Sequence, residues 1–309
     1  MITVSYLEKI NLSPNPRFQK IIGDLILTPN YNFFANVDID IKDIHRVPKD
    51  ENVIFAMNHT DRYNYWPFMY KLWKLKKYPF ITVWVKGEYY RNKWLAKALN
   101  GCNLIPVPSM KYLIEEIFQN TFGRRISKEE YRFLKDSITN NKIVNNGSVP
   151  PDSPVHFMLD QNFIEFIKIY FNEVMNRVSK LSKDALLKKG LSLIIFPEGT
   201  RTTKLIEGKT GMAQLAVHTK KTIIPVGCSN CENVYKGNLP FAKSGKVVYR
   251  VGKPLSFDGA LKEFRIDQEF ILFSDESKTK YNSIFEAITK IVMENINNLI
   301  DERYRSNFP

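Results

Sequence analysis

The sequence predicts an α/β fold with a single mixed, largely parallel sheet flanked by helices. Short runs rich in Val, Ile and Phe recur along the chain, and several are continuous, which is typical of strands buried on both faces. Helical patterns lie between these runs, and strands that alternate with helices indicate an α/β domain. The runs that predict strands are 52–57, 80–85, 103–107, 191–196, 222–226 and 246–251.

Apolar residues at three- and four-residue spacing predict two long helices. The first covers 162–188 and ends near Gly190, directly before the strand at 191–196. The second covers 281–303 and carries its apolar residues on one face. Both patterns suit helices that pack on a core. For the first helix, which is rich in aromatic residues, the alternative is a surface that docks on a bilayer.

A break in this alternation of strands and helices at 110–161 predicts an insertion, either a lid or a helical or loop subdomain. The break contains a charged piece at 123–130 and a polar run at 139–142. It ends with Pro150 and Pro151 among Gly, Ser and Asp, a composition that continues neither a helix nor a central strand. We therefore expect a single domain over 1–309 with this insertion.

The composition excludes several classes of protein. With 309 residues, of which 44% are hydrophobic and 25% charged, the chain can fill a core, so disorder, collagen and coiled coil are excluded. No apolar run approaches the roughly 20 residues of a membrane-spanning helix, and the N-terminus lacks the pattern of a signal peptide. Three cysteines do not make a disulfide framework. A cytoplasmic protein is expected.

The excess of basic residues predicts an anionic partner. The chain carries 45 Lys and Arg against 32 Asp and Glu, a formal net charge of +13, which attracts phospholipid headgroups, phosphate esters, acidic carrier proteins or nucleic acid. Lysines beside tryptophans and tyrosines at 66–97 suit a membrane interface or single-stranded nucleic acid, or form a plain solvated face. Because no nucleic-acid-binding motif is present, a nucleic-acid partner is not expected.

Polar residues follow two of the predicted strands at the point where each strand ends. Residues 53–57 lead into Asn58-His59-Thr60-Asp61-Arg62-Tyr63-Asn64, and 193–196 lead into Pro197-Glu198-Gly199-Thr200-Arg201. If these strands are parallel neighbours, both clusters face one crevice. A histidine is a suitable general base near neutral pH, an arginine offers a planar fork for phosphate, and a glycine lets the backbone approach an anion.

The same segments resemble conserved blocks of the glycerolipid acyltransferases of the lysophosphatidic acid acyltransferase (PlsC-like) type. The strongest block is Phe196-Pro197-Glu198-Gly199-Thr200-Arg201, which matches that family's FPEGTR at every position. Weaker likenesses, in the family's order, are Asn58-His59, Val85-Lys86-Gly87-Glu88, Lys209-Thr210-Gly211 and Thr222-Ile223-Ile224-Pro225-Val226. Together the blocks span 53–227.

The resemblance implies an O-acyltransferase that moves a fatty acyl group from an acyl thioester to a lysophospholipid or glycerol-phosphate-like acceptor. It implies acyl-CoA or acyl carrier protein as the donor, no cofactor and no metal, and a peripheral position on the cytoplasmic face of a membrane. By position, His59 is the base and Pro225 is structural. The acceptor phosphate is expected to contact Lys86, Glu198, Gly199, Thr200 and Arg201. The alternative for Glu198 and Arg201 is an ion pair that pins their loop.

Two departures from the family pattern concern the chemistry directly. The family has Asp five residues after the histidine, to orient the imidazole, whereas this chain has Asn64; Asp61 is the candidate to replace that carboxylate. Ser109 stands where the family has an arginine after its Ile-Pro-Val strand, which leaves Lys111, Arg124 or Arg125 to supply the charge. The alternative function is therefore a catalytically impaired lipid- or anion-binding member of the same fold.

One further motif is interpreted as incidental. Cys228-Ser229-Asn230-Cys231 has the spacing of redox and zinc sites, but only the single residues Cys102 and His218 are available as further ligands. We therefore expect an ordinary pair of cysteines in a loop.

Overall fold

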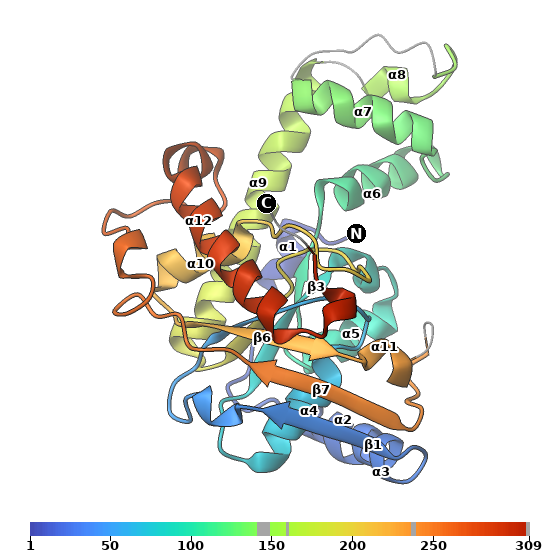
Figure 1. Ribbon diagram of the computed structural model, residues 1–309. Coiled ribbons are helices and arrows are strands. Elements are labelled where there is room, and N and C mark those ends of the chain that lie inside the picture. Colours follow the sequence, from blue (N-terminus) through green and yellow to red (C-terminus); the bar gives the residue numbers. More distant parts are fainter. Residues whose placement is uncertain (141–148, 159–160, 236–238, 307–309) are drawn as a thin grey trace. The chain divides into compact units, whose positions relative to one another are not determined.

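The computed structural model describes residues 1–309 with the exception of 141–148, 159–160, 236–238 and 307–309 (Figure 1). The chain divides into two compact units. The first comprises Met1–Ile10, Val85–Lys97 and Pro106–Val178, and the second Asn11–Trp84, Ala98–Ile105 and Ser179–Pro309. The insertion expected at 110–161 lies within the first unit, and its role as a lid stays a prediction.

A mixed sheet of seven strands, in the order β1-β7-β6-β2-β5-β3-β4, belongs mainly to the second unit, and only the last residues of β3 and β4 belong to the first. Strand β2 pairs in parallel with β5 and β6, β3 with β5, and β1 with β7, whereas β6 and β7 are antiparallel. The predicted α/β fold with one mixed, largely parallel sheet is thus confirmed. The strands are β1 (Val37–Lys42), β2 (Ile54–Met57), β3 (Ile81–Lys86), β4 (Ile105–Val107), β5 (Ser192–Ile195), β6 (Ile223–Ser229) and β7 (Gly245–Val251).

All six predicted strands are present, and the sequence analysis missed β1. This strand alternates Val and Ile with Asp38 and Asp40, so it lacks the continuous apolar run used to find the others. It lies at the edge of the sheet, where both carboxylates contact Lys246 of β7 at 3.1 Å. Alternation of this kind is the pattern of a half-exposed strand.

The helical segments are short apart from α9 and α12. Those within the second unit are α2 (Arg17–Ile22), η1 (Gly23–Leu27), α3 (Thr28–Asn32), η2 (Ile44–Arg46), α4 (Tyr65–Leu75), η4 (Asp184–Lys188), α10 (Gly211–Thr219), α11 (Cys231–Val234), η5 (Lys262–Phe264), α12 (Asp275–Leu299) and η6 (Glu302–Tyr304). The first unit holds α1 (Val4–Glu8), η3 (Gly87–Arg91), α6 (Met110–Phe122), α7 (Lys128–Asn140) and α8 (Val155–Met158). Two helices, α5 (Lys93–Gly101) and α9 (Gln161–Lys183), have residues in both units.

The first long helix agrees with its prediction and the second is displaced. Helix α9 continues through the π-helical turn η4 to Lys188, and Gly190 follows with a φ of +62°, as expected for 162–188. Helix α12 begins at Asp275, six residues before the predicted start, because the Ser274 hydroxyl accepts a hydrogen bond from the Ser277 N–H and caps it. It ends at Leu299, so the predicted end at 303 was wrong.

Helices cover both faces of the sheet in the second unit. In Figure 1, α10 and α12 lie on one face, and α4 lies with α2 and α3 on the other. Phe55 of β2 meets Phe68 of α4 edge to face at 5.2 Å between ring centroids. On the opposite face α12 packs closely: a Cβ on Gly227 of β6 would lie 2.6 Å from the Leu299 carbonyl carbon. This close packing holds β6 in place, and with it the loops that follow the carboxyl ends of the neighbouring strands.

A buried carboxylate holds the start of α7 in the first unit. Ser127 and Glu130 form a capping box: the Glu130 N–H donates to the Ser127 hydroxyl, and the Ser127 N–H donates to the Glu130 carboxylate. Arg124 donates to both carboxylate oxygens, at 2.7 and 2.9 Å, and Ser153 donates to one of them. The Arg124 guanidinium, with these smaller contributions, lowers the pKa of Glu130 to about 2.

Replacing Glu130 with glutamine should therefore destabilise the protein in a pH-dependent way. A carboxyl whose pKa is lowered by folding contributes stability above its unfolded pKa of about 4.5 and loses it as the pH falls towards 2. We expect E130Q to lower the free energy of unfolding by about 2 kcal/mol at pH 7, with the difference from the wild type shrinking below pH 4. Urea titrations across this range measure it. The control is E129Q at the exposed neighbour, and an equal effect of both variants would contradict the prediction.

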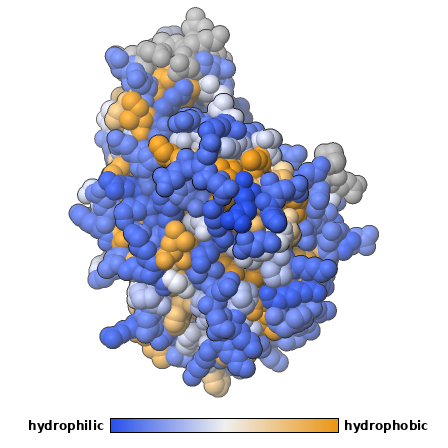
Figure 2. All heavy atoms as spheres, turned by 90° about the vertical axis from the view of Figure 1, so that its left-hand side faces the viewer, coloured by the Kyte–Doolittle hydropathy of each residue, from blue (hydrophilic) through white to orange (hydrophobic). Residues whose placement is uncertain are grey.

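The surface is mainly hydrophilic where Figure 2 displays it. Hydrophilic residues predominate on that face, and apolar residues lie among them in small groups. Within the described ranges, none of the helices has the length and apolarity needed to cross a bilayer.

Candidate active site

The two polar clusters predicted from the sequence follow neighbouring strands. Ile54, Phe55 and Ala56 of β2 pair in parallel with residues 193–195 of β5, so both strands end at the same edge of the sheet. The loop after β2 and the loop after β5 therefore start side by side. The structure brings together the two segments that the sequence placed at one crevice, and both lie in the second unit.

Glu198 joins the two loops. Its carboxylate accepts hydrogen bonds from the His59 N–H at 2.6 Å and the Thr202 hydroxyl at 2.6 Å. The Ile206 N–H is a third, longer donor at 3.4 Å. The side chain is only 2% exposed, and this burial raises the pKa of its carboxyl despite the three donors. The structure thus directs Glu198 inwards, towards the loops, and Arg201 is not its partner.

His59 lies against the second loop with its ring and its main chain. The imidazole stacks on the Phe196 ring, with centroids 4.1 Å apart and planes inclined by 19°. The His59 carbonyl accepts a hydrogen bond from the Thr202 N–H at 2.9 Å. Main-chain bonds on both sides of the residue therefore fix where its imidazole stands.

The solvent-facing part of the second loop is formed by Gly199, Thr200 and Arg201, all exposed. Gly199 has a φ of +65°, a left-handed conformation that favours glycine. Pro197 and Glu198 are buried beneath them. The loop therefore has a fixed inner half and an accessible outer half that carries the guanidinium.

The side chains of Asp61 and Asn64 accept main-chain hydrogen bonds at the turn before α4. The Asp61 carboxylate accepts from the Tyr63 N–H at 2.7 Å, and the Asn64 side-chain oxygen accepts from the Asp61 N–H at 2.5 Å. Asn64 is fully buried and its amide donates to the Thr60 hydroxyl. Burial raises the pKa of Asp61, while the N–H donors of Tyr63 and Arg62 and the charge of Arg201 oppose the rise. Asp61 is thus buried, with the Arg201 charge close enough to affect it.

An aspartate at position 64 should be tolerated. In Asn64→Asp one oxygen still accepts from the Asp61 N–H, and the Thr60 hydroxyl can turn to donate to the other. We expect a change in the free energy of unfolding within about 1 kcal/mol and no loss of the activity that the sequence resemblance implies. Urea titration and thioester assays measure both. Asn64→Leu, which has no acceptor, should lose more stability; an inactive or unfolded Asn64→Asp protein would show that the amide has a role of its own.

Asn58 holds the first loop to β6. Its amide donates to the Cys228 carbonyl and its side-chain oxygen accepts from the Cys228 N–H, at 2.9 and 2.6 Å. Cys228 and Cys231 are free, buried thiols, and burial raises the pKa of Cys231. In the part of the chain that the structure describes, no group of three or more His, Cys, Asp or Glu residues is placed to hold a metal ion.

The C-terminal segment completes the surroundings of the site, and the sequence analysis missed it. The Leu205 N–H donates to the Tyr304 carbonyl at 2.8 Å, and the Asn230 N–H donates to the Tyr304 hydroxyl at 3.0 Å. The same hydroxyl and Arg303 both donate to Glu232. Residues 301–306 therefore tie the loop after β5 to the loop after β6. Nothing in the local sequence distinguishes this tail from an ordinary polar C-terminus.

The remaining predicted residues lie in the first unit. Lys86 is exposed at the end of β3, and its role towards a substrate stays a prediction. Ser109 caps α6, since its hydroxyl accepts from the Tyr112 N–H at 3.1 Å. Lys111 contacts Glu115 at 3.6 Å, and Arg124 is bound to Glu130. Two of the three cations proposed to replace the missing arginine are thus engaged in ion pairs.

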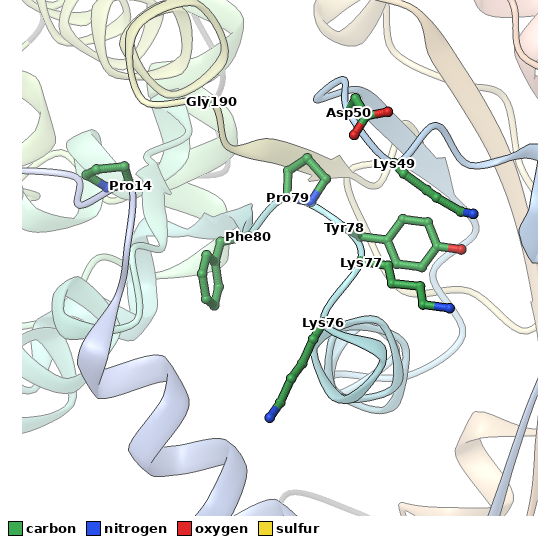
Figure 3. Close-up of a pocket in the computed structure, with 9 residues that line it drawn as sticks. All are labelled: Pro14, Lys49, Asp50, Lys76, Lys77, Tyr78, Pro79, Phe80 and Gly190. Atoms are coloured by element: carbon green, nitrogen blue, oxygen red, sulfur yellow. The ribbon is translucent and has the colours of Figure 1, made fainter.

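A shallow pocket elsewhere in the second unit lies at the opposite ends of the strands (Figure 3). Asp50, Phe80 and Gly190 line it, and they precede β2, β3 and β5. In Figure 3 the Lys76 side chain points away from Lys49 and Lys77, so the three ammonium groups do not converge. Unlike the two loops at the carboxyl ends of the strands, this pocket does not bring its charged side chains together at one point.

A family comparison bears on the loop after β5. The family model described as Acyltransferase matches residues 156–229, which include β5, the Phe196–Arg201 loop and β6. These residues are thus similar to acyltransferases. The predicted resemblance is confirmed there, whereas the His59 loop, with Asn64 in place of Asp, lies outside the matched residues.

Two individual proteins are similar to this chain. The chain is 33% identical over 76 residues to the 1-acyl-sn-glycerol-3-phosphate acyltransferase of Cocos nucifera; the match covers 24% of this chain and spans about a quarter (25%) of that relative. Among solved structures, the 1-acyl-sn-glycerophosphate acyltransferase PlsC of Thermotoga maritima aligns with a TM-score of 0.40 and 17% identity, over 94% of this chain and 79% of that one.

Proposed function

We propose that the protein is an O-acyltransferase that transfers a fatty acyl group from an acyl thioester to the hydroxyl of a lysophospholipid or glycerol-phosphate-like acceptor. The observation that carries the proposal is the junction of the two loops, in which Glu198 binds the His59 N–H and the His59 ring stacks on Phe196. It presents an imidazole beside a loop whose exposed half carries Arg201. A base next to an anion site is the arrangement that acyl transfer to a phosphorylated alcohol requires.

In this mechanism His59 takes the proton of the acceptor hydroxyl as its oxygen attacks the thioester carbonyl. The carbon–sulfur bond then breaks, an ester is formed, and the leaving thiolate takes the proton from the imidazolium. The thiolate is a good leaving group, so a positioned base and a positioned acceptor suffice and no cofactor is needed. Arg201 and the loop backbone at Gly199 hold the acceptor phosphate. The buried Asp61 carboxylate stabilises the positive charge of Arg201. Acyl-CoA and acyl carrier protein both supply such a thioester.

The protein is further proposed to act as a peripheral protein on the cytoplasmic face of a membrane. The supporting observation is a set of exposed apolar side chains in and just after the helical stretch from α2 to α3, called the apolar patch below. Its exposed members are Phe18, Ile21, Leu25, Ile26, Phe33 and Phe34, of which the last two are 80% and 84% exposed. With a net charge of +13, this patch fits an anionic bilayer, into which aromatic side chains insert while cations meet the headgroups.

Charged residues in this apolar patch should release the protein from membranes. Each buried phenylalanine contributes about 1.5–3 kcal/mol, so F33D/F34D is expected to weaken binding to vesicles of phosphatidylglycerol and phosphatidylcholine by at least tenfold. Co-sedimentation with such vesicles measures it. The control is I271D, at an exposed apolar residue outside the patch. Equal binding by the wild type and F33D/F34D would remove this surface from the proposal.

The assay of the enzyme proposal follows thiol release and ester formation by the full chain. Acyl-CoA and acyl carrier protein are tested as donors, with lysophosphatidate, glycerol 3-phosphate and lysophosphatidylcholine as acceptors, and the His59→Ala protein as the control. Acceptor-dependent release by the wild type is expected. Specific lipid binding without release above the control would instead identify a catalytically impaired lipid-binding protein.

A further inference from the structure

Lys209 lies directly over the backbone of the Gly199 loop. A Cβ built on Gly199 would lie 3.1 Å from the Lys209 Nζ and 3.3 Å from its Cδ and Cε. The Lys209 N–H donates to the Pro197 carbonyl at 2.9 Å, which fixes the base of this side chain to the same loop. The absence of a side chain at position 199 therefore leaves the room that the lysine occupies.

Arg201 and Lys209 are two cations beside Gly199, the first in the chain and the second in space. Within the described ranges, neither Arg201 nor Lys209 forms an ion pair, although both are exposed and near Gly199 in sequence or space. Lys209 also stands two residues before the start of α10 at Gly211, and the N-terminus of this helix adds positive potential. Although the Arg201 charge reaches the buried Asp61 carboxyl, neither cation is held in an ion pair, and both therefore remain available to an incoming anion.

We infer that Lys209 is a second phosphate-binding residue of this site, which together with Arg201 holds a phosphate group over Gly199. The inference rests on the proposed function and adds to it a second binding residue. It also names the kind of phosphate, because two cations suit a doubly charged phosphate monoester better than a singly charged diester. The phosphate belongs either to the acceptor or to the nucleotide part of acyl-CoA. The experiment separates these two sources.

The kinetic test compares Lys209→Met and Lys209→Arg, with Lys204→Met as the matched control from the exposed part of the same loop. Loss of a charge-assisted bond to phosphate should raise the KM for one substrate roughly tenfold with little change in kcat, and Lys209→Arg should restore most of it. A higher KM for lysophosphatidate with either donor assigns the acceptor phosphate. A higher KM for acyl-CoA alone, with acyl carrier protein unaffected, assigns the nucleotide phosphates.

A binding test keeps the inference separate from the enzyme proposal. Titrations with glycerol 3-phosphate and with adenosine 3′,5′-bisphosphate, followed by ³¹P NMR, are expected to show weaker binding of one of them by Lys209→Met and unchanged binding by Lys204→Met. This result stands even if no acyl transfer is detected. Wild-type binding and KM values in the Lys209→Met protein would overturn the inference while leaving acyl transfer, if measured, intact.

Discussion

Replacing His59 with alanine is expected to lower kcat/KM for acyl transfer by about 10³-fold, because general base catalysis typically contributes 10²- to 10⁴-fold. The loss should appear in kcat, since the substitution removes the group that takes the hydroxyl proton. Both main-chain bonds of residue 59, to Glu198 and from Thr202, survive the substitution. The loops should therefore keep their positions, and the KM for both substrates should change little.

The experiment measures initial rates of thiol release at saturating donor and acceptor, beside a urea titration of the same protein. The matched variant is Phe196→Leu, which removes the stacking ring but keeps the imidazole. It should cost far less activity than His59→Ala. If His59→Ala keeps more than a tenth of the wild-type rate, the imidazole is not the base and the mechanism proposed here is wrong.

The sheet was predictable because burial on both faces leaves a direct trace in the sequence. Strands β2, β3, β5 and β6 are enclosed, so each is a continuous apolar run, whereas β1 needs only one apolar face and was missed. The start of α12 was misplaced for a related reason. Its first turns carry few apolar residues, and the signal was the Ser274 cap followed by Asp275 and Glu276, not periodicity.

The site was predictable as a pair of loops but not in the direction of its side chains. Parallel strands necessarily end at one edge, which is why Asn58-His59 and the Phe196–Arg201 segment meet. The sequence does not tell whether a glutamate in such a loop faces the substrate or its own backbone, and here Glu198 binds N–H groups. Tyr304 joins the site from a segment about a hundred residues away, through contacts that no local pattern encodes.

Replacing Glu198 with alanine is expected to damage both the fold and the activity. The substitution leaves the N–H groups of His59 and Ile206 and the Thr202 hydroxyl without their acceptor at a site that is almost fully buried. Unsatisfied buried donors cost about 1–3 kcal/mol each, and partial relaxation of an exposed loop reduces their sum, so we expect a loss of about 3 kcal/mol in the free energy of unfolding. Because Glu198 also positions His59, kcat/KM should fall at least 100-fold.

Glu198→Gln separates the geometry of this side chain from its charge. The amide oxygen can still accept from the His59 N–H, and the amide nitrogen can donate to the Thr202 hydroxyl, so only the long bond from Ile206 loses its acceptor. Burial raises the pKa of Glu198, which means that folding disfavours the charge and that a neutral replacement should be mild. We expect Glu198→Gln to cost about 1 kcal/mol and less than tenfold in rate. If glutamine proves as damaging as alanine, the carboxylate charge itself acts in catalysis, and Glu198 is more than the link between the two loops.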